Sequence, residues 1–148
     1  MRILTLVLCL MGMLTEAFAQ KPTNEKPTRF HQLPSIIHCH PGQLDAFFRS
    51  APGESVQVQI SEALTIRGTM KNRISKYGTL ETAGIQLSEY GQSIFALTRR
   101  QTPEGKTVFT GRILDNRFSD GLLLRQQGEE YELVKVETAQ MLPTCDQK

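Results

Sequence analysis

The chain has 148 residues, of which 39% are hydrophobic and 22% are charged, and its formal net charge at pH 7 is +2. This length allows one domain with its own core. The nearly neutral charge and the lack of tryptophan argue against a nucleic-acid-binding protein.

Residues 1–19 have the pattern of a secretory signal peptide. Met1-Arg2 is a short cationic start, residues 3–14 are uncharged and mostly apolar, and Ala17-Phe18-Ala19 has the small side chains that signal peptidases accept. The apolar run is shorter than the roughly 20 residues of a membrane-spanning helix. We therefore expect export to a periplasm or to the extracellular medium, with a mature chain that starts at Gln20 and carries no membrane anchor.

The first part of the mature chain, residues 20–33, is expected to be a flexible linker. It contains two Lys-Pro pairs, and Leu33 is its one aliphatic side chain. Apolar side chains become frequent only afterwards. The sequence therefore predicts a single domain over residues 34–148.

Cysteine usage predicts one disulfide bond. The chain has three cysteines, and removal of the signal peptide discards Cys9 and leaves Cys39 and Cys145. Two cysteines in an oxidising compartment are expected to pair. This bond would join the two ends of the domain; the alternative is two free thiols.

One helix is predicted, between Pro41 and Ala51. Leu44, Phe47 and Phe48 have the spacing of one helical face, and Pro52-Gly53 ends the run. A narrow aromatic face of this kind suits a short helix that packs on a sheet or closes the mouth of a small barrel.

After residue 55 the apolar side chains alternate with polar ones, which is typical of strands with one buried face. Turn signals that contain glycine stand between the apolar segments, as in Tyr77-Gly78 and Tyr90-Gly91. The predicted strands cover residues 55–60, 64–70, 79–87, 93–100, 107–114, 121–126 and 131–136.

The short connections predict the fold class. Parallel neighbours would need crossovers of a dozen or more residues, for which the chain has no room after Pro52. We expect a mainly β fold: an antiparallel meander of six or seven strands, curved or closed into a small barrel, with one short N-terminal helix. An open sheet with the helix packed on one face is the alternative.

A basic segment with an aromatic neighbour is the first candidate binding site. Lys71, Arg73 and Lys76 lie in a predicted loop beside Tyr77. Such a group can follow a phosphate backbone, but the nearly neutral domain and its export make nucleic acid an unlikely partner. We expect these four residues to contact another ligand.

The second candidate is the polar loop from Asp115 to Gly121, in which Asp115 and Asp120 are the acidic residues. Its spacing does not match a calcium-binding EF-hand, because Arg117 and Ser119 occupy ligand positions. A hairpin loop with Asp120-Gly121 in the turn explains the same residues.

The remaining polar residues do not form a catalytic or metal-binding motif. His38 and His40 would point to the same side of an extended segment, but two imidazoles are too few for a zinc site. The sequence has no HExxH, CxxC or GxSxG motif, and carboxylates such as Glu62 and Glu81 are isolated in sequence. We expect no cofactor, no metal and no enzymatic activity.

These features together predict a secreted, non-catalytic binding or accessory module. Its sheet face or loops would recognise a protein, a glycan or a small ligand. The alternative is an inhibitor or prodomain-like regulator of a secreted peptidase, because rigid loops lose little entropy when they bind.

Overall fold

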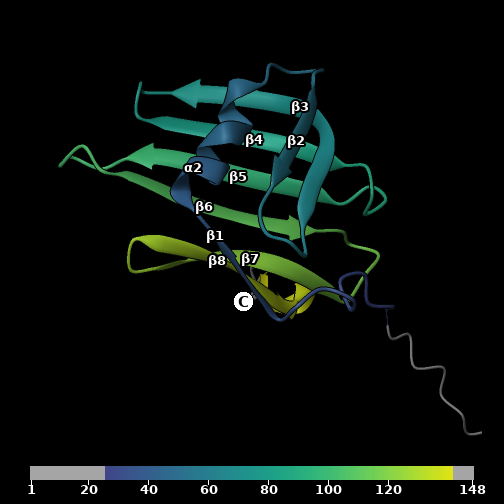
Figure 1. Ribbon diagram of the computed structural model, residues 1–148. Helices are drawn as coiled ribbons and strands as arrows, with labels where there is room; N and C mark the ends of the chain where they lie inside the picture. Colours follow the sequence, from purple (N-terminus) through teal and green to yellow (C-terminus); the bar gives the residue numbers. More distant parts are fainter. Residues whose placement is uncertain (1–25, 142–148) are drawn as a thin grey trace, which may run out of the picture.

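The computed structural model describes residues 26–141, which form one eight-stranded antiparallel sheet curled into a half-barrel (Figure 1). The strand order is β1-β8-β7-β6-β5-β4-β3-β2, so that β1 and β2 are the two edges. The predicted class, mainly β, antiparallel and curved with one short helix near the N-terminus, is confirmed. In chain order the elements are β1 (Ile36–Cys39), α2 (Pro41–Ala46), the 3-10 helix η1 (Phe47–Arg49), β2 (Ser55–Gln59), β3 (Thr65–Lys76), β4 (Leu80–Leu87), β5 (Ile94–Gln101), β6 (Thr107–Leu114), β7 (Asp120–Gln127), β8 (Glu130–Glu137) and α3 (Thr138–Met141).

The predicted helix is present. It begins at Pro41 as α2 and continues from Phe47 as the 3-10 helix η1. Pro41 suits the first helical turn because proline has no backbone N–H to leave unpaired. The side chain of Gln43 accepts a hydrogen bond from the backbone N–H of His40 at 2.8 Å, which fixes the start of α2. The helix thus begins directly after β1.

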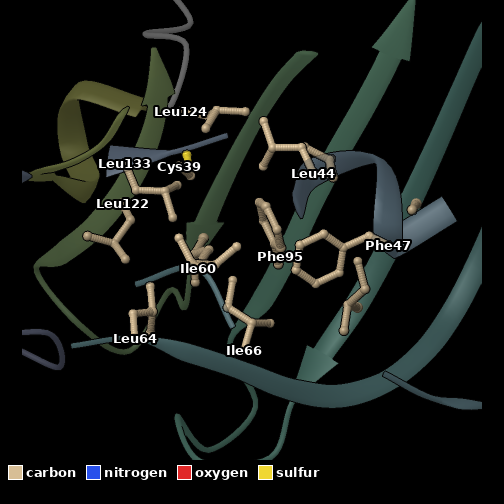
Figure 2. Close-up of a cluster of buried hydrophobic side chains, with 14 of the residues drawn as sticks. Cys39, Leu44, Phe47, Ile60, Leu64, Ile66, Phe95, Leu122, Leu124 and Leu133 are labelled. Atoms are coloured by element: carbon tan, nitrogen blue, oxygen red, sulfur yellow. The ribbon is translucent and has the colours of Figure 1, made fainter. Parts of the chain in front are cut away.

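The helical segment covers the concave face of the sheet, as Figure 1 shows for α2. Leu44, Phe47 and Phe48 are at most 3% exposed. The Phe47 ring meets Phe95 of β5 edge-on, with 5.2 Å between centroids. Figure 2 shows Leu44 and Phe47 against the side chains of the sheet. Aromatic packing of this kind joins the helix and the sheet in one core.

Strand β1 was not predicted, and it brings the number of strands to eight. Its four residues alternate between exposed and buried, with Ile37 and Cys39 in the core. β1 pairs with β8, through Ile36 opposite Val134 and Cys39 opposite Tyr131. A segment this short contains too few alternations to be recognised from sequence.

Strand β3 is longer than predicted. It was expected to end at Met70, but it continues to Lys76 because β4 pairs with it as far as Leu80. A β-bulge between Met70 and Asn72 shifts the register at this point. Lys71, Arg73 and Lys76 therefore lie in a strand, and the prediction of a loop for them was wrong.

The second half of β3 ends in a tight turn. Tyr77 and Gly78 both have positive φ angles, of 58° and 69°. Glycine adopts this conformation without strain, and Tyr77 is the one non-glycine residue with positive φ among residues 26–141. The turn sends the chain directly into β4.

Residues 26–33, here called the strap, pack against the body of the domain. The Phe30 side chain is 1% exposed, and its backbone N–H donates to Asp120 at 2.8 Å. The backbone N–H of Ser119 donates to the carbonyl of Pro27 at 3.0 Å. This part of the predicted linker is thus bound to the start of β7, and the packed chain begins before Pro34.

Some predicted features lie outside residues 26–141: the signal peptide, the start of the mature chain at Gln20, and Cys145 with its disulfide bond. Cys39 itself is buried in the core. Over the described range, we find no helix with the length and apolar character needed to cross a membrane.

Candidate functional site

The sheet has two ends that differ in their connections. The turns between β3 and β4, between β5 and β6, and between β7 and β8 lie together at the left of Figure 1, at what we call the hairpin end. The strap and the loop 115–119 lie at the opposite end, here called the strap end. The predicted binding residues are divided between these two ends.

Asp120 and Asp115 lie at the strap end, where other residues of the domain already occupy their carboxylates. Asp120 begins β7, not a turn as predicted, and accepts the backbone N–H groups of Arg29 and Phe30. Asp115 accepts hydrogen bonds from the Arg117 backbone N–H at 3.0 Å and from Arg117 Nε at 2.9 Å. Both aspartates are less than 9% exposed. These contacts stabilise the strap end and leave little carboxylate surface for a ligand.

Lys71, Arg73, Lys76 and Tyr77 lie together at the hairpin end, along the second half of β3. Strand β2 pairs with β3 from Thr65 to Thr69 only. Among residues 26–141, no other strand pairs with the side of Lys71–Lys76 that faces away from β4, and we call this side the free edge. Together with the outer sides of the edge strands β1 and β2, the free edge is a place where described strand backbone has no strand neighbour.

Large apolar side chains are exposed at the free edge. Ile74 is 50% exposed and Tyr77 is 90% exposed. Natural proteins usually cover or shorten an edge strand, because its unpaired N–H and C=O groups can pair with another chain. Ile74 and Tyr77 give the free edge apolar surface, and Ile36 on the edge strand β1 is exposed to a similar extent, at 49%.

A network of ion pairs supports the hairpin from the concave face. Glu81 of β4 binds Arg73 across the hairpin and Arg99 on β5, and Arg99 also binds Asp45 of α2. The Arg99 guanidinium lies 4.6 Å from the centroid of the Phe48 ring. These contacts connect β3, β4, β5 and α2, so the hairpin is held in one position.

The charge of Glu81 is maintained by this network. Burial of its carboxyl acts to raise the pKa, but hydrogen bonds from Arg73 and Arg99 outweigh burial and hold the pKa below its ordinary value. The same contacts raise the pKa of Arg99, against the opposing effect of burial. Glu81 is thus an ionised structural contact and lacks the raised pKa of a general acid.

Two hollows flank the hairpin. A polar one of about 200 Å³ lies on the concave side and is lined by Ser75, Gly78, Thr79, Leu80, Glu81, Arg99, Gln101 and Thr107. A more apolar one of about 300 Å³ lies on the outer face and is lined by Leu80, Thr98, Arg100, Val108 and Thr110. Ile74 on β3 is paired with Thr82 on β4, which contacts Thr98 at the rim of this outer hollow.

The two histidines noted in the sequence lie on β1 and at the start of α2, and each faces a glutamate of β8. His38 Nδ1 is 3.4 Å from Glu132, and His40 Nδ1 is 2.6 Å from Glu130. Within residues 26–141 there is no group of three or more histidine, cysteine or acidic side chains arranged to hold a metal ion.

The sequence analysis treats Glu81 as an isolated carboxylate and does not connect it with Arg99. They are direct partners across β4 and β5. The signal was available, because an antiparallel hairpin centred on the predicted turn at Tyr90 places these two positions opposite each other. Asp45 has no comparable signal, since its contact depends on where α2 crosses the sheet.

Comparison of the chain with protein-family models, with curated proteins and with solved structures gives no match.

The buried acidic contacts predict a loss of stability in acid. Hydrogen bonds from the Arg117 side chain lower the pKa of Asp115 from 3.8 to about 2. A carboxyl whose pKa is lowered by folding adds stability above its unfolded pKa, and this contribution is lost as the pH falls towards the folded pKa. We expect the free energy of unfolding to fall between about pH 4 and pH 2, and to fall less steeply in Asp115→Asn.

Urea unfolding at a series of pH values measures this dependence. Glu62→Gln is the control, because Glu62 is exposed and forms no ion pair within the described chain. An unchanged acid slope in Asp115→Asn would show that the Asp115–Arg117 contact does not contribute to the acid sensitivity.

Proposed function

We propose that this chain is an exported, non-catalytic binding module that holds a protein partner at the free edge of β3. Export rests on the signal-peptide pattern of residues 1–19, and the same compartment would join Cys39 to Cys145 in a disulfide bond. The observation that supports binding most directly is Ile74, half exposed on a strand edge that no other described strand covers.

The support of the hairpin favours this function. A partner that binds a mobile loop must order it, which costs free energy, whereas a strand already held in place avoids this cost. Arg73, Glu81 and Arg99 hold the hairpin in this way. Tyr77 at the turn adds a large side chain of the kind that is enriched in protein interfaces.

Regulation of a secreted peptidase is the second candidate, and the same edge favours it. Adding a strand to an exposed sheet edge is a common mode of peptide recognition. A free edge would allow the chain to pair with an extended segment of a peptidase. Stoichiometric suppression of peptidase activity in the same secretions would select this candidate over a simple binding module.

Replacing Ile74 by serine should weaken binding of the partner about tenfold, which corresponds to a loss of about 1.4 kcal/mol of binding free energy. Losses of this size are typical of the few central, well-packed side chains of an interface. The matched control is Ile36→Ser, because Ile36 on the opposite edge strand β1 is 49% exposed, against 50% for Ile74. Both variants should stay folded, as shown by circular dichroism.

The measurement is affinity capture from the secretions of the source cells, followed by titration of each captured species against both variants. A partner that binds Ile74→Ser with unchanged affinity contradicts the proposed site. A partner lost in Ile36→Ser but not in Ile74→Ser would move the site to β1.

A further inference from the structure

We infer that the occupant of the free edge is an extended acidic segment of the partner, which adds to the sheet as a further strand beside β3. This inference rests on the proposed function and specifies the chemistry of the partner. It is supported by three observations: the main-chain edge without a strand neighbour, the lysines Lys71 and Lys76 along it, and the apolar side chain of Ile74 between them.

The backbone requires an extended partner. Lys71–Lys76 has strand geometry because it pairs with β4, and its other side has no strand neighbour within residues 26–141. A strand edge presents N–H and C=O groups at the spacing of another strand. A helix or a globular surface cannot form hydrogen bonds with all of these groups. The occupant therefore pairs through its own main chain.

The charges require an acidic partner. Lys71 and Lys76 are exposed, and they form no ion pair with residues 26–141. The charge of Arg73 is balanced by Glu81. Opposite charges on neighbouring strands stabilise their pairing and like charges destabilise it. A second copy of this chain would bring the same lysines to the contact, so self-pairing is disfavoured.

The outer face sets the order of side chains in the partner. Ile74 and Lys76 are two positions apart and lie on the same face of β3, where Ile74 stands opposite Thr82. Alternate residues of an added strand also share a face. The partner strand should place an apolar side chain beside Ile74, and an aspartate or glutamate two residues away, beside Lys76.

The experiment selects binders to the mature chain, residues 20–148, from a displayed library of random twelve-residue peptides. We expect enrichment of sequences without proline that have an apolar residue two positions from an acidic one. The best peptide is then synthesised and titrated by fluorescence anisotropy. Lys76→Glu should weaken binding of the peptide about tenfold, and added salt should weaken binding of the peptide to the wild-type protein. Lys106→Glu is the control, an exposed lysine at the neighbouring turn of the hairpin end.

Amide hydrogen exchange locates the bound peptide. We expect the amides of alternate residues in Lys71–Lys76 to become protected from exchange. We also expect that N-methylation of single peptide residues abolishes binding at every second position and has little effect at the others. Selection of peptides without acidic residues, protection elsewhere, or no selected peptide overturns this inference. A dimer in sedimentation that is lost in Ile74→Ser also overturns it, because the occupant is then a second copy. The proposed function fails separately, if the captured partner tolerates Ile74→Ser.

Discussion

Replacing Phe30 by alanine should lower the free energy of unfolding by about 3 to 5 kcal/mol, the usual cost of removing a buried phenylalanine side chain. The Phe30 ring is 1% exposed and contacts Tyr90, with 5.2 Å between centroids. Its backbone is fixed by Asp120, so the strap cannot easily move into the cavity that alanine would leave. Urea unfolding followed by circular dichroism measures the loss.

Thr28→Ala is the matched control, because Thr28 is an exposed residue of the same strap. A surface substitution of this kind usually changes stability by less than about 0.5 kcal/mol. If Phe30→Ala also changed stability by less than about 1 kcal/mol, the strap would be a linker whose packing adds little to the fold. A large loss in Phe30→Ala alone would establish the strap as part of the domain.

The strap shows where local sequence patterns are insufficient. Its composition, with Lys-Pro pairs and few aliphatic side chains, indicates a linker. The position of Phe30 is decided by Asp120, which is 90 residues further along the chain. A contact at this distance leaves no local pattern, and Phe30 as a single aromatic residue in a polar segment was the only available signal.

The strands from β2 to β8 could be predicted because each buries one face. Val56, Ile66, Ile85 and Leu97 are all buried, and each belongs to an alternating run. Consecutive short turns then fix the antiparallel order. The second half of β3 has no buried side chain, so its alternation disappears even though the strand continues. Its strand conformation comes from pairing with β4, which sequence patterns do not report.

Part of the candidate site could be recognised from the sequence, and its arrangement in space could not. Lys71, Lys76 and Tyr77 are exposed, as a basic and aromatic segment between two apolar runs suggests. Their arrangement on a free edge depends on β2 ending before β3 does, which is a property of the pairing. Asp115 and Asp120 were recognised as a polar cluster, but their partners come from Arg117 and the strap.

Replacing Cys145 by serine should lower the free energy of unfolding by about 4 to 5 kcal/mol if the proposed bond to Cys39 forms, since a crosslink over about a hundred residues restricts the unfolded chain strongly. Two free thiols predict a change near zero. Cys145→Ser is more informative than Cys39→Ser, because Cys39 is 1% exposed and a serine there would place a hydroxyl in the core whether or not the bond exists.

The chemistry of Cys39 determines how the bond must be detected. Burial, together with the nearby Glu130, raises the pKa of a Cys39 thiol to about 12. Such a thiol would not react with an alkylating reagent in the folded protein, just as a disulfide would not. The chain must therefore be unfolded in urea without reductant, alkylated and weighed. Two added alkyl groups reject the bond; none, followed by a gain of about two daltons on reduction, establishes it.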